Sequence, residues 1–247
     1  MRAKLLLIVA VLIITAAMAQ AQPNVPILEV DTLAYLGKTE SGNSGGALFL
    51  PDGNIIALWN ARPLIIDSKT GVIIRKLDSC ASESVSEPQL SPDGTKFVAT
   101  KMGPTFVIWD VPSGKIIKEM KNVNDYRFSP DGTKLYICGG NSSGLGAVRV
   151  YDANTFEEIE RFGAVSSGWK MDLSPDGMMI GMASYRKPYN DSDTKTNQVI
   201  LIDLKDKTKI NVLETLEPQV YSMDFSPNGK QVTFVYGGPN ANTYIYI

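Results

Sequence analysis

Short hydrophobic runs separated by polar turns recur along most of this chain. The runs are rich in Val, Ile, Leu and aromatic residues, which is typical of short β-strands. The first run of each set ends in a large apolar residue, and these residues are Phe49, Leu90, Phe128, Leu173 and Phe225. A second and a third run follow, and in four sets the third run ends on an acidic residue: Asp67, Asp110, Asp152 and Asp203. The pattern predicts five sets of antiparallel strands.

The first and second runs of every set are joined by Pro-Asp-Gly or Pro-Asn-Gly, with the prolines at Pro51, Pro92, Pro130, Pro175 and Pro227. Proline presets φ near −65°, Asp or Asn bonds the local backbone, and Gly accepts the positive φ that closes a tight hairpin. The turn returns at intervals of 38 to 52 residues, a period typical of propeller blades. We therefore predict an all-β chain, a β-propeller of four-stranded antiparallel blades.

One set carries a more specific resemblance. Val107, Ile108, Trp109 and Asp110, with Ser-Pro-Asp-Gly upstream, resemble the WD-repeat and YVTN-repeat propellers of the quinoprotein amine dehydrogenase-like superfamily, of which the YVTN group is common on bacterial surfaces. The resemblance extends from Ala47 to the end of the chain. It departs from the WD pattern because no Gly-His dipeptide precedes any set and the Trp-Asp pair occurs once. The resemblance implies the fold and leaves the function open.

The ends of the repeat region bear on the number of blades. The fifth set stops at Ile247 before a fourth run, and residues 27–35 form a spare hydrophobic strand near the other end. We expect about five blades, with the N-terminal strand completing the last blade and removing the exposed strand edges. A chain that stops early in a longer gene accounts for the same pattern, so both interpretations are open.

The first 21 residues read as a secretory signal peptide. Arg2 and Lys4 precede an uncharged run over 5–17, and small residues follow at Ala19 and Ala21. The run is too short to span a bilayer, and no later segment is long and apolar enough to do so. We expect an exported protein, periplasmic or extracellular, with no membrane span after cleavage. Residues 22–45 are then the closing strand and its connection, and residues 46–247 the propeller.

Composition excludes several kinds of chemistry. The chain has no histidine, which removes His-assisted nucleophiles and His-bearing zinc or haem sites. The formal net charge of −2 argues against a nucleic-acid partner. Cys80 falls in a loop after the first blade and Cys138 in a strand of the third. We expect two separate thiols, although an oxidising compartment leaves their oxidation open.

The position two residues before the turn serine is polar in the last four sets, as Gln89, Arg127, Asp172 and Asp224, whereas the first set has Leu48 at the corresponding position. Among them, Arg127 of the third blade is expected to lie beside Asp172 of the fourth. A buried charge is costly unless it is paired, so we expect an ion pair between blades that lines the channel and has a structural role. A catalytic alternative would use Asp172 and Asp224 with a metal ion.

The loops opposite the Pro-Asp-Gly turns differ in length and are the expected binding face, since variable loops on a rigid scaffold usually carry specificity. We predict that aromatic and Arg side chains anchor a partner there, namely Trp169, Tyr185, Arg186 and Tyr189. The same long loop holds Asn190, Asp191 and Asp193, whose oxygen atoms could bind Ca²⁺. We expect a solvated loop there and no cofactor.

Three functions remain open from the sequence. We expect a non-catalytic, monomeric scaffold that binds a protein or a glycan. Resemblance to the YVTN group also admits a lactonase-like hydrolase or a metal- or quinone-dependent oxidoreductase. The third interpretation is a fragment of a larger cell-surface propeller protein, in which these blades serve as a spacer.

Overall fold

The computed structural model describes residues 46–59, 61–80, 85–101, 105–140, 145–166, 168–185, 197–215, 219–237 and 244–246. They belong to the second of two compact units, Leu36–Ile247. The expected signal peptide, the closing strand at 27–35 and its connection lie outside the described residues. In the ranges given, the regular structure consists of strands, and no helix could cross a membrane.

The strands form five sheets, each made of consecutive strands. The first contains β1 (Ala47–Phe49), β2 (Ile55–Trp59), β3 (Arg62–Ile66) and β4 (Ile73–Lys76). The second contains β5 (Val85–Leu90), β6 (Lys96–Lys101), β7 (Thr105–Asp110) and β8 (Lys115–Lys121). The third contains β9 (Asp125–Phe128), β10 (Lys134–Gly140), β11 (Leu145–Asp152) and β12 (Glu158–Ser166). The fourth contains β13 (Gly168–Leu173), β14 (Met179–Tyr185), β15 (Asn197–Asp203) and β16 (Lys209–Thr215). The fifth contains β17 (Gln219–Phe225), β18 (Val232–Gly237) and β19 (Tyr244–Tyr246).

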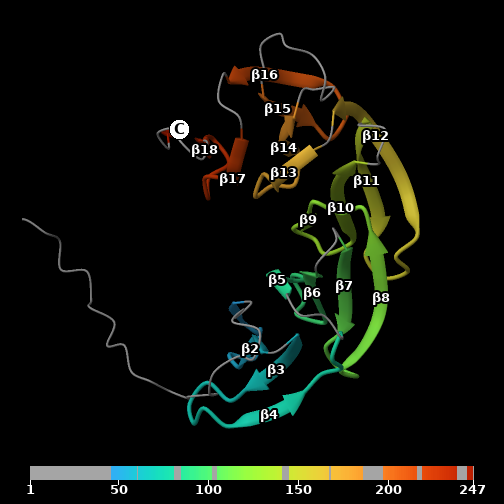
Figure 1. Ribbon diagram of the computed structural model, residues 1–247, viewed down its shortest axis with the longest axis vertical. Helices are drawn as coiled ribbons and strands as arrows, with labels where there is room; N and C mark the ends of the chain where they lie inside the picture. Colours follow the sequence, from blue (N-terminus) through green and yellow to red (C-terminus); the bar gives the residue numbers. More distant parts are fainter. Residues whose placement is uncertain are drawn as a thin grey trace, which may run out of the picture. The chain divides into compact units, whose positions relative to one another are not determined.

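Every sheet is an up-and-down antiparallel meander in chain order. Four sheets have four strands, and the described part of the fifth has three. Figure 1 shows the sheets in succession along the chain, coloured from blue for the first to red for the fifth. The predicted all-β architecture of four-stranded antiparallel blades is confirmed. We number the sheets as blades 1 to 5 and call the first strand of each blade its inner strand.

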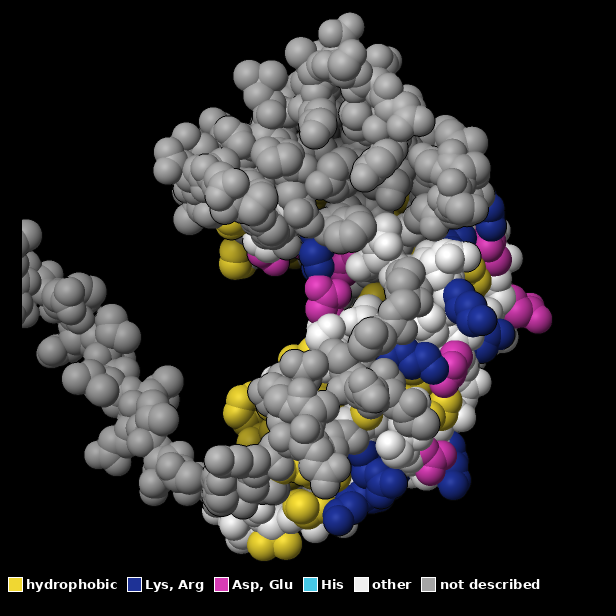
Figure 2. Space-filling view, viewed as in Figure 1, with side chains coloured by type: hydrophobic (Ala, Val, Ile, Leu, Met, Phe, Trp, Pro, Cys, Tyr) yellow, Lys and Arg dark blue, Asp and Glu magenta, His cyan; other side chains and the backbone are white. Residues whose placement is uncertain are grey.

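The hydrophobic core lies between successive blades. Four clusters of buried side chains join blades 1 and 2, 2 and 3, 3 and 4, and 4 and 5. Trp109 illustrates the packing, because its indole is fully buried against blade 1 and its Nε1 donates to the Asp78 carbonyl at 2.8 Å. Each blade therefore supports the next one. Some hydrophobic side chains of the first blade remain exposed, among them Phe49, Val72 and Ile74. Figure 2 shows hydrophobic side chains at the surface in yellow.

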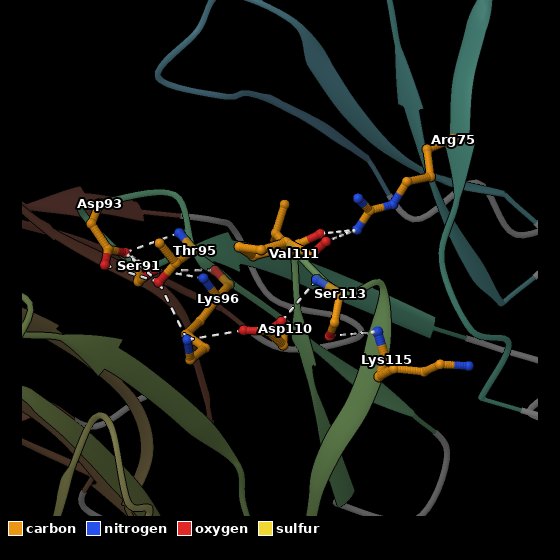
Figure 3. A network of polar contacts seen from close by, with 10 residues as sticks. Arg75, Ser91, Asp93, Thr95, Lys96, Asp110, Val111, Ser113 and Lys115 are labelled. Atoms are coloured by element: carbon orange, nitrogen blue, oxygen red, sulfur yellow. Dashed lines mark hydrogen bonds and ion pairs between the residues drawn. The ribbon is translucent and has the colours of Figure 1, made fainter.

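The repeated turn is held by its own side chains. In blade 2, Ser91 Oγ donates to Asp93 Oδ1 at 2.6 Å, and Asp93 Oδ1 accepts the N–H of Thr95 at 2.9 Å (Figure 3). The N–H of Lys96 returns to Ser91 Oγ at 2.9 Å. Equivalent serine contacts recur at Asp131, Asp176 and Asn228. Gly94 has a φ of 71°, which an L side chain rarely adopts, so the motif requires glycine there.

The aspartate that ends the third strand caps the next turn. In blade 2, Asp110 Oδ2 accepts the N–H of Ser113 at 2.9 Å, and Lys96 Nζ lies 3.3 Å from Asp110 Oδ1 (Figure 3). A neighbouring blade reaches the same turn, because the guanidinium of Arg75 donates to the carbonyls of Val111 and Pro112. The recurring acidic residue of the sequence pattern therefore has a local structural role.

Candidate functional site

The inner strands of blades 2 to 5 carry a group of charged side chains, most of which contact one another. We call it the inner-strand charge cluster; its members are Glu87 on β5, Asp125 and Arg127 on β9, Lys170 and Asp172 on β13, and Asp224 on β17. These residues occupy positions that alternate with the apolar residues of the same strands. Side chains along a strand alternate between its two faces, which brings the charged groups together away from the apolar ones.

Arg127 is the centre of the cluster. Its Nη1 lies 2.7 Å from Asp125 Oδ1 on the same strand, and its Nε lies 3.0 Å from Asp172 Oδ1 on the next blade. The side chains of Arg127, Asp172 and Asp125 are 24%, 18% and 5% exposed. One guanidinium thus bridges two carboxylates that are largely withdrawn from water. The structure places the two residues expected to pair, Arg127 and Asp172, in direct contact.

Both carboxylates also bind backbone of the following blade. Asp125 Oδ2 accepts the N–H of Met171 at 3.0 Å, and Asp172 Oδ2 accepts the N–H of Phe225 at 2.7 Å. Asp172 therefore divides its two oxygens between a side-chain donor and a main-chain donor, whereas Asp125 Oδ1 accepts the N–H of Tyr126 at 2.9 Å in addition to the guanidinium of Arg127. Removing either one would leave donors without an acceptor in a partly buried environment, which is costly.

Glu87 joins the cluster because its backbone adopts an unusual conformation. It has a φ of 53° and lies in a register shift between Ser86 and Gln89, a β-bulge in which the inner strand bends. The bulge directs its carbonyl toward the Tyr126 hydroxyl, which donates to it, and Glu87 Oε1 lies 2.5 Å from Lys170 Nζ. This ion pair joins blade 2 to blade 4 across blade 3.

The surroundings shift the protonation equilibria of the cluster. Burial raises the pKa of Asp125, although the neighbouring guanidinium of Arg127 opposes the shift. Burial disfavours the charge on Arg127, but Asp125 and Asp172 outweigh it and raise the pKa of the guanidinium. The pKa of Asp224 is raised by burial and then by the like charge of Asp172. The protonation of each of these groups therefore depends on the charges of the others, and their attraction joins neighbouring blades.

A regular rule governs the position two residues before the turn serine. In blades 2, 3 and 4 this side chain binds the inner strand of the next blade. Gln89 Nε2 donates to the Tyr126 carbonyl at 2.8 Å, Arg127 pairs with Asp172, and Asp172 accepts the Phe225 N–H. Asp224 occupies this position in blade 5, where its backbone pairs with Thr233 but its side chain makes no hydrogen bond to a described residue.

Sequence reasoning missed three members of the cluster, namely Glu87, Asp125 and Lys170. Asp125 and Lys170 could have been found, because both lie an even number of residues from the predicted pair along their strands. Glu87 could not have been found, because the β-bulge that reorients its side chain is not visible in the alternation of polar and apolar residues along the strand.

The structure describes the backbone of two of the four predicted binding residues and the side chain of none of them. Trp169 lies on β13 and Tyr185 ends β14, but their side chains are outside the described part of the chain. Arg186 and Tyr189 lie outside the described residues, as do the three residues considered for Ca²⁺, Asn190, Asp191 and Asp193. These assignments stay predictions. Within the ranges described, no group of three or more Cys, Asp and Glu residues could hold a metal ion.

The two cysteines lie in different hydrophobic clusters. Cys80 packs between blades 1 and 2, where its Sγ lies 3.3 Å from the Ala61 carbonyl, and Cys138 is fully buried between blades 3 and 4. Burial and then the charge of Asp125 raise the pKa of the Cys138 thiol. A thiol held in its neutral form is a poor nucleophile, so Cys138 serves as a core residue.

Comparison with known proteins supports the fold of the chain and does not identify its family. No family model matches the chain. Among solved structures, 1376 chains match it, so the architecture is common and says little about function. One of them is the hydrazine synthase of Kuenenia stuttgartiensis, a protein that contains a β-propeller. The TM-score is 0.63 with 16% sequence identity, and the match covers 85% of this chain and 60% of that one. The chain thus spans 60% of the length of this structural relative.

Proposed function

We propose that this chain is an exported, non-catalytic propeller scaffold related to the WD-repeat and YVTN-repeat proteins. It binds a protein or a glycan through the loops that connect second to third strands and one blade to the next. The signal-peptide pattern of residues 1–21 supports export, and the repeated Ser-Pro-Asp-Gly turn supports the relationship to these repeat families.

The difference between the two ends of the blades carries this proposal. At one end, which we call the turn rim, the first-to-second and third-to-fourth turns of a blade bind each other. A single backbone hydrogen bond joins the two turns in blades 2, 3 and 4: Val111 N to Thr95 O at 2.8 Å, Ala153 N to Thr133 O at 2.9 Å, and Leu204 N to Met178 O at 2.9 Å. This bond holds the two turns of a blade together in the same way in each of these blades, so the turn rim varies little from blade to blade.

The opposite end, the loop rim, is made of connections of unequal length. The connection from β10 to β11 is short, whereas the one from β14 to β15 spans residues 186–196. The inner-strand charge cluster joins blades 2 and 4, 3 and 4, and 4 and 5. A rigid scaffold with variable loops is the usual arrangement of a binding protein.

Binding by the mature chain tests the proposal. The protein is immobilised and exposed to a glycan array and to envelope proteins of the producing cell, and the response is compared with that of the triple variant Tyr185→Ala, Arg186→Ala, Tyr189→Ala. Since aromatic and Arg anchors supply most of the binding energy in such interfaces, we expect the variant to lose at least about tenfold in affinity.

A matched variant controls for unspecific effects. Lys69→Ala, Ser113→Ala and Lys205→Ala alter three exposed residues of the turn rim and are expected to leave binding unchanged. Equal losses in the two triple variants would refute the loop rim as the binding face. A tightly held metal ion, together with turnover of a lactone, would replace the scaffold proposal with an enzyme.

A further inference from the structure

The fourth strand of each blade is its outer strand, and the outer strands differ in charge. In blades 1 and 2, β4 and β8 together contain one acidic residue, Glu119, and five basic ones. The basic residues are Arg75, Lys76, Lys115, Lys118 and Lys121. In blades 3 and 4, β12 and β16 contain two basic and three acidic residues. The positive charge of the outer strands is therefore concentrated on blades 1 and 2.

Ion pairs neutralise the acidic groups of this surface and leave basic groups over. Glu119 Oε2 lies 2.7 Å from Lys101 Nζ of the same blade, and Asp78 Oδ1 lies 3.5 Å from Lys115 Nζ. Lys76, Lys118 and Lys121 are exposed and form no ion pair with a described residue. Each charge that remains without a counter-charge on these two outer strands is therefore positive.

The outer strand of blade 3 provides a comparison within the same chain. Its one cation, Arg161, lies 2.8 Å from Glu158, and Glu160 lies 3.6 Å from Lys207 of blade 4. Lysines at a sheet edge can serve only to prevent pairing with another chain. Blade 3 has an outer edge of the same kind and carries no such lysine on β12, so edge protection does not account for the lysines of blades 1 and 2.

Contacts between blades 1 and 2 hold their outer strands next to each other. The guanidinium of Arg75 donates to the Pro112 carbonyl at 2.8 Å, and the Asp78 N–H donates to the Gly114 carbonyl at 2.8 Å. The end of β4 is thus joined to the start of β8. We call the four exposed lysines of these two strands the basic strip. Its members are Lys76, Lys115, Lys118 and Lys121.

Exposed aliphatic side chains accompany the basic strip. Val72, Ile74 and Ile117 are 61%, 54% and 42% exposed. Ile74 and Ile117 each lie at a β-bulge, where the outer strand has one residue more than its partner strand. Ile159 occupies the same bulge position in blade 3 and is 54% exposed, but no strip of lysines surrounds it. Figure 2 shows Lys and Arg side chains beside hydrophobic ones in the lower part of the view.

We propose that the basic strip and its aliphatic neighbours bind the surface of an anionic lipid bilayer. Lysines near such a surface are attracted by the negative headgroups, and each strengthens binding by about fivefold. Exposed aliphatic side chains enter the boundary between headgroups and acyl chains. A soluble polyanion would match the lysines but would offer no apolar phase to Val72, Ile74 and Ile117. The combination of the two kinds of side chain therefore favours a bilayer.

Sedimentation with lipid vesicles tests the proposal. The mature chain is mixed with vesicles of phosphatidylglycerol and phosphatidylcholine in equal parts, and separately with vesicles of phosphatidylcholine alone. We expect binding to the anionic vesicles only. The binding should weaken by about tenfold or more when the salt is raised from about 0.1 M to about 1 M, because the Debye length falls from about 10 Å to about 3 Å.

Charge reversal tests the lysines. The variant Lys118→Glu, Lys121→Glu is expected to bind the anionic vesicles at least about twentyfold more weakly, since it removes two of the attracting charges. The matched control is Lys205→Glu, Lys230→Glu, which makes the same change in net charge at exposed turn positions of blades 4 and 5. The control should bind within about twofold of the unmodified chain, because distant charges are screened. Equal losses in the two variants would overturn the proposal.

Two isoleucines at equivalent bulges test the apolar part. Ile117→Ser removes an aliphatic side chain beside the basic strip and is expected to weaken vesicle binding by about threefold or more. Ile159→Ser makes the same change in blade 3 and should leave binding unchanged. Both positions are exposed, so urea midpoints of the two variants should match that of the unmodified chain and show that they fold.

Two further results would refute a lipid partner. A chain that stays in solution with both kinds of vesicle would show that the lysines only protect the sheet edges. Binding to dextran sulfate without binding to the vesicles would show that the basic strip recognises a soluble polyanion.

Discussion

Aspartates in two regions of the chain have pKa values that shift in opposite directions. The pKa is lowered at the turn residues Asp93, Asp131 and Asp176, and it is raised at Asp125 and Asp224 on the inner strands. In the turns, the Ser129 hydroxyl and the N–H of Thr133 lower the pKa of Asp131 to about 2. On the inner strands, burial raises the pKa of Asp125. Hydrogen-bond donors in contact with water favour the charged form, whereas withdrawal from water disfavours it even beside a guanidinium. The turn carboxylates therefore stabilise the fold locally, and the inner ones join blades at a desolvation cost.

The largest expected effect tests the inner strands. Asp125→Ala removes one partner of Arg127 and the acceptor of the Met171 N–H, so we expect a loss of about 3 kcal/mol in the free energy of unfolding. Urea denaturation at pH 7 measures it. Asp172→Ala removes similar contacts from a side chain that is 18% exposed, and we expect a smaller loss of about 2 kcal/mol. Losses below about 0.5 kcal/mol in both variants would show that the cluster does not support the fold.

A smaller effect is expected in a turn. Asp93→Ala removes the acceptor for Ser91 Oγ and for the N–H of Thr95, at a site in contact with water, so we expect a loss of about 1 kcal/mol. Thermal and urea midpoints measure it. Blade 1 offers a natural control, because Leu50 stands where the other blades have serine. Asp52→Ala removes the acceptor for the N–H and for the side-chain amide of Asn54, both exposed, and is expected to cost about 0.5 kcal/mol. A larger loss at Asp52 than at Asp93 would contradict the role given to the serine.

The smallest change in stability is expected from a substitution that gives the turn of blade 5 the aspartate found in the other turns. Asn228 accepts from Ser226 Oγ at 2.8 Å but does not titrate. In Asn228→Asp the new carboxylate is expected to have a lowered pKa, as at Asp131, and to add about 0.5 kcal/mol at pH 7. A group whose folded pKa is lowered gives stability that is present above its unfolded pKa and lost as the pH falls through the folded value.

The gain over the unmodified chain should therefore be constant above pH 5 and should disappear between about pH 4 and pH 2. Urea midpoints across this range measure it. Asp131→Asn makes the opposite change and serves as the control. In this variant the urea midpoint should fall less between pH 4 and pH 2 than in the unmodified chain. A gain that persists at pH 2 would contradict an electrostatic origin.

Most of the fold could be predicted because its signals are local. The Pro-Asp-Gly turns and the acidic ends of the third strands act within a few residues of their own position. The sequence therefore contains enough information to place the hairpins of each blade, and repetition makes the prediction robust. The structure adds the register of the strands and the packing of one blade on the next.

The candidate site could be predicted only in part, because it depends on contacts between distant residues. Arg127 and Asp172 follow from the alternation of their strands. The contact of Glu87 with Lys170 spans 83 residues and depends on a backbone bulge. A positive φ at a glutamate is not encoded by a local pattern such as a turn glycine, so it could not be inferred from the sequence.

The contact between the turn proline of one blade and the turn glycine of the next also bears on how such a chain evolves. It recurs at Pro51–Gly94, Pro92–Gly132, Pro130–Gly177 and Pro175–Gly229, so a duplicated genetic unit brings both partners with it. An extra copy inserted in frame at a blade boundary would find matching surfaces on both sides, and a deletion would leave the remaining surfaces compatible. Length variation in units of one blade is thus a tolerated form of change for this architecture, whereas a partial unit leaves a surface without its counterpart.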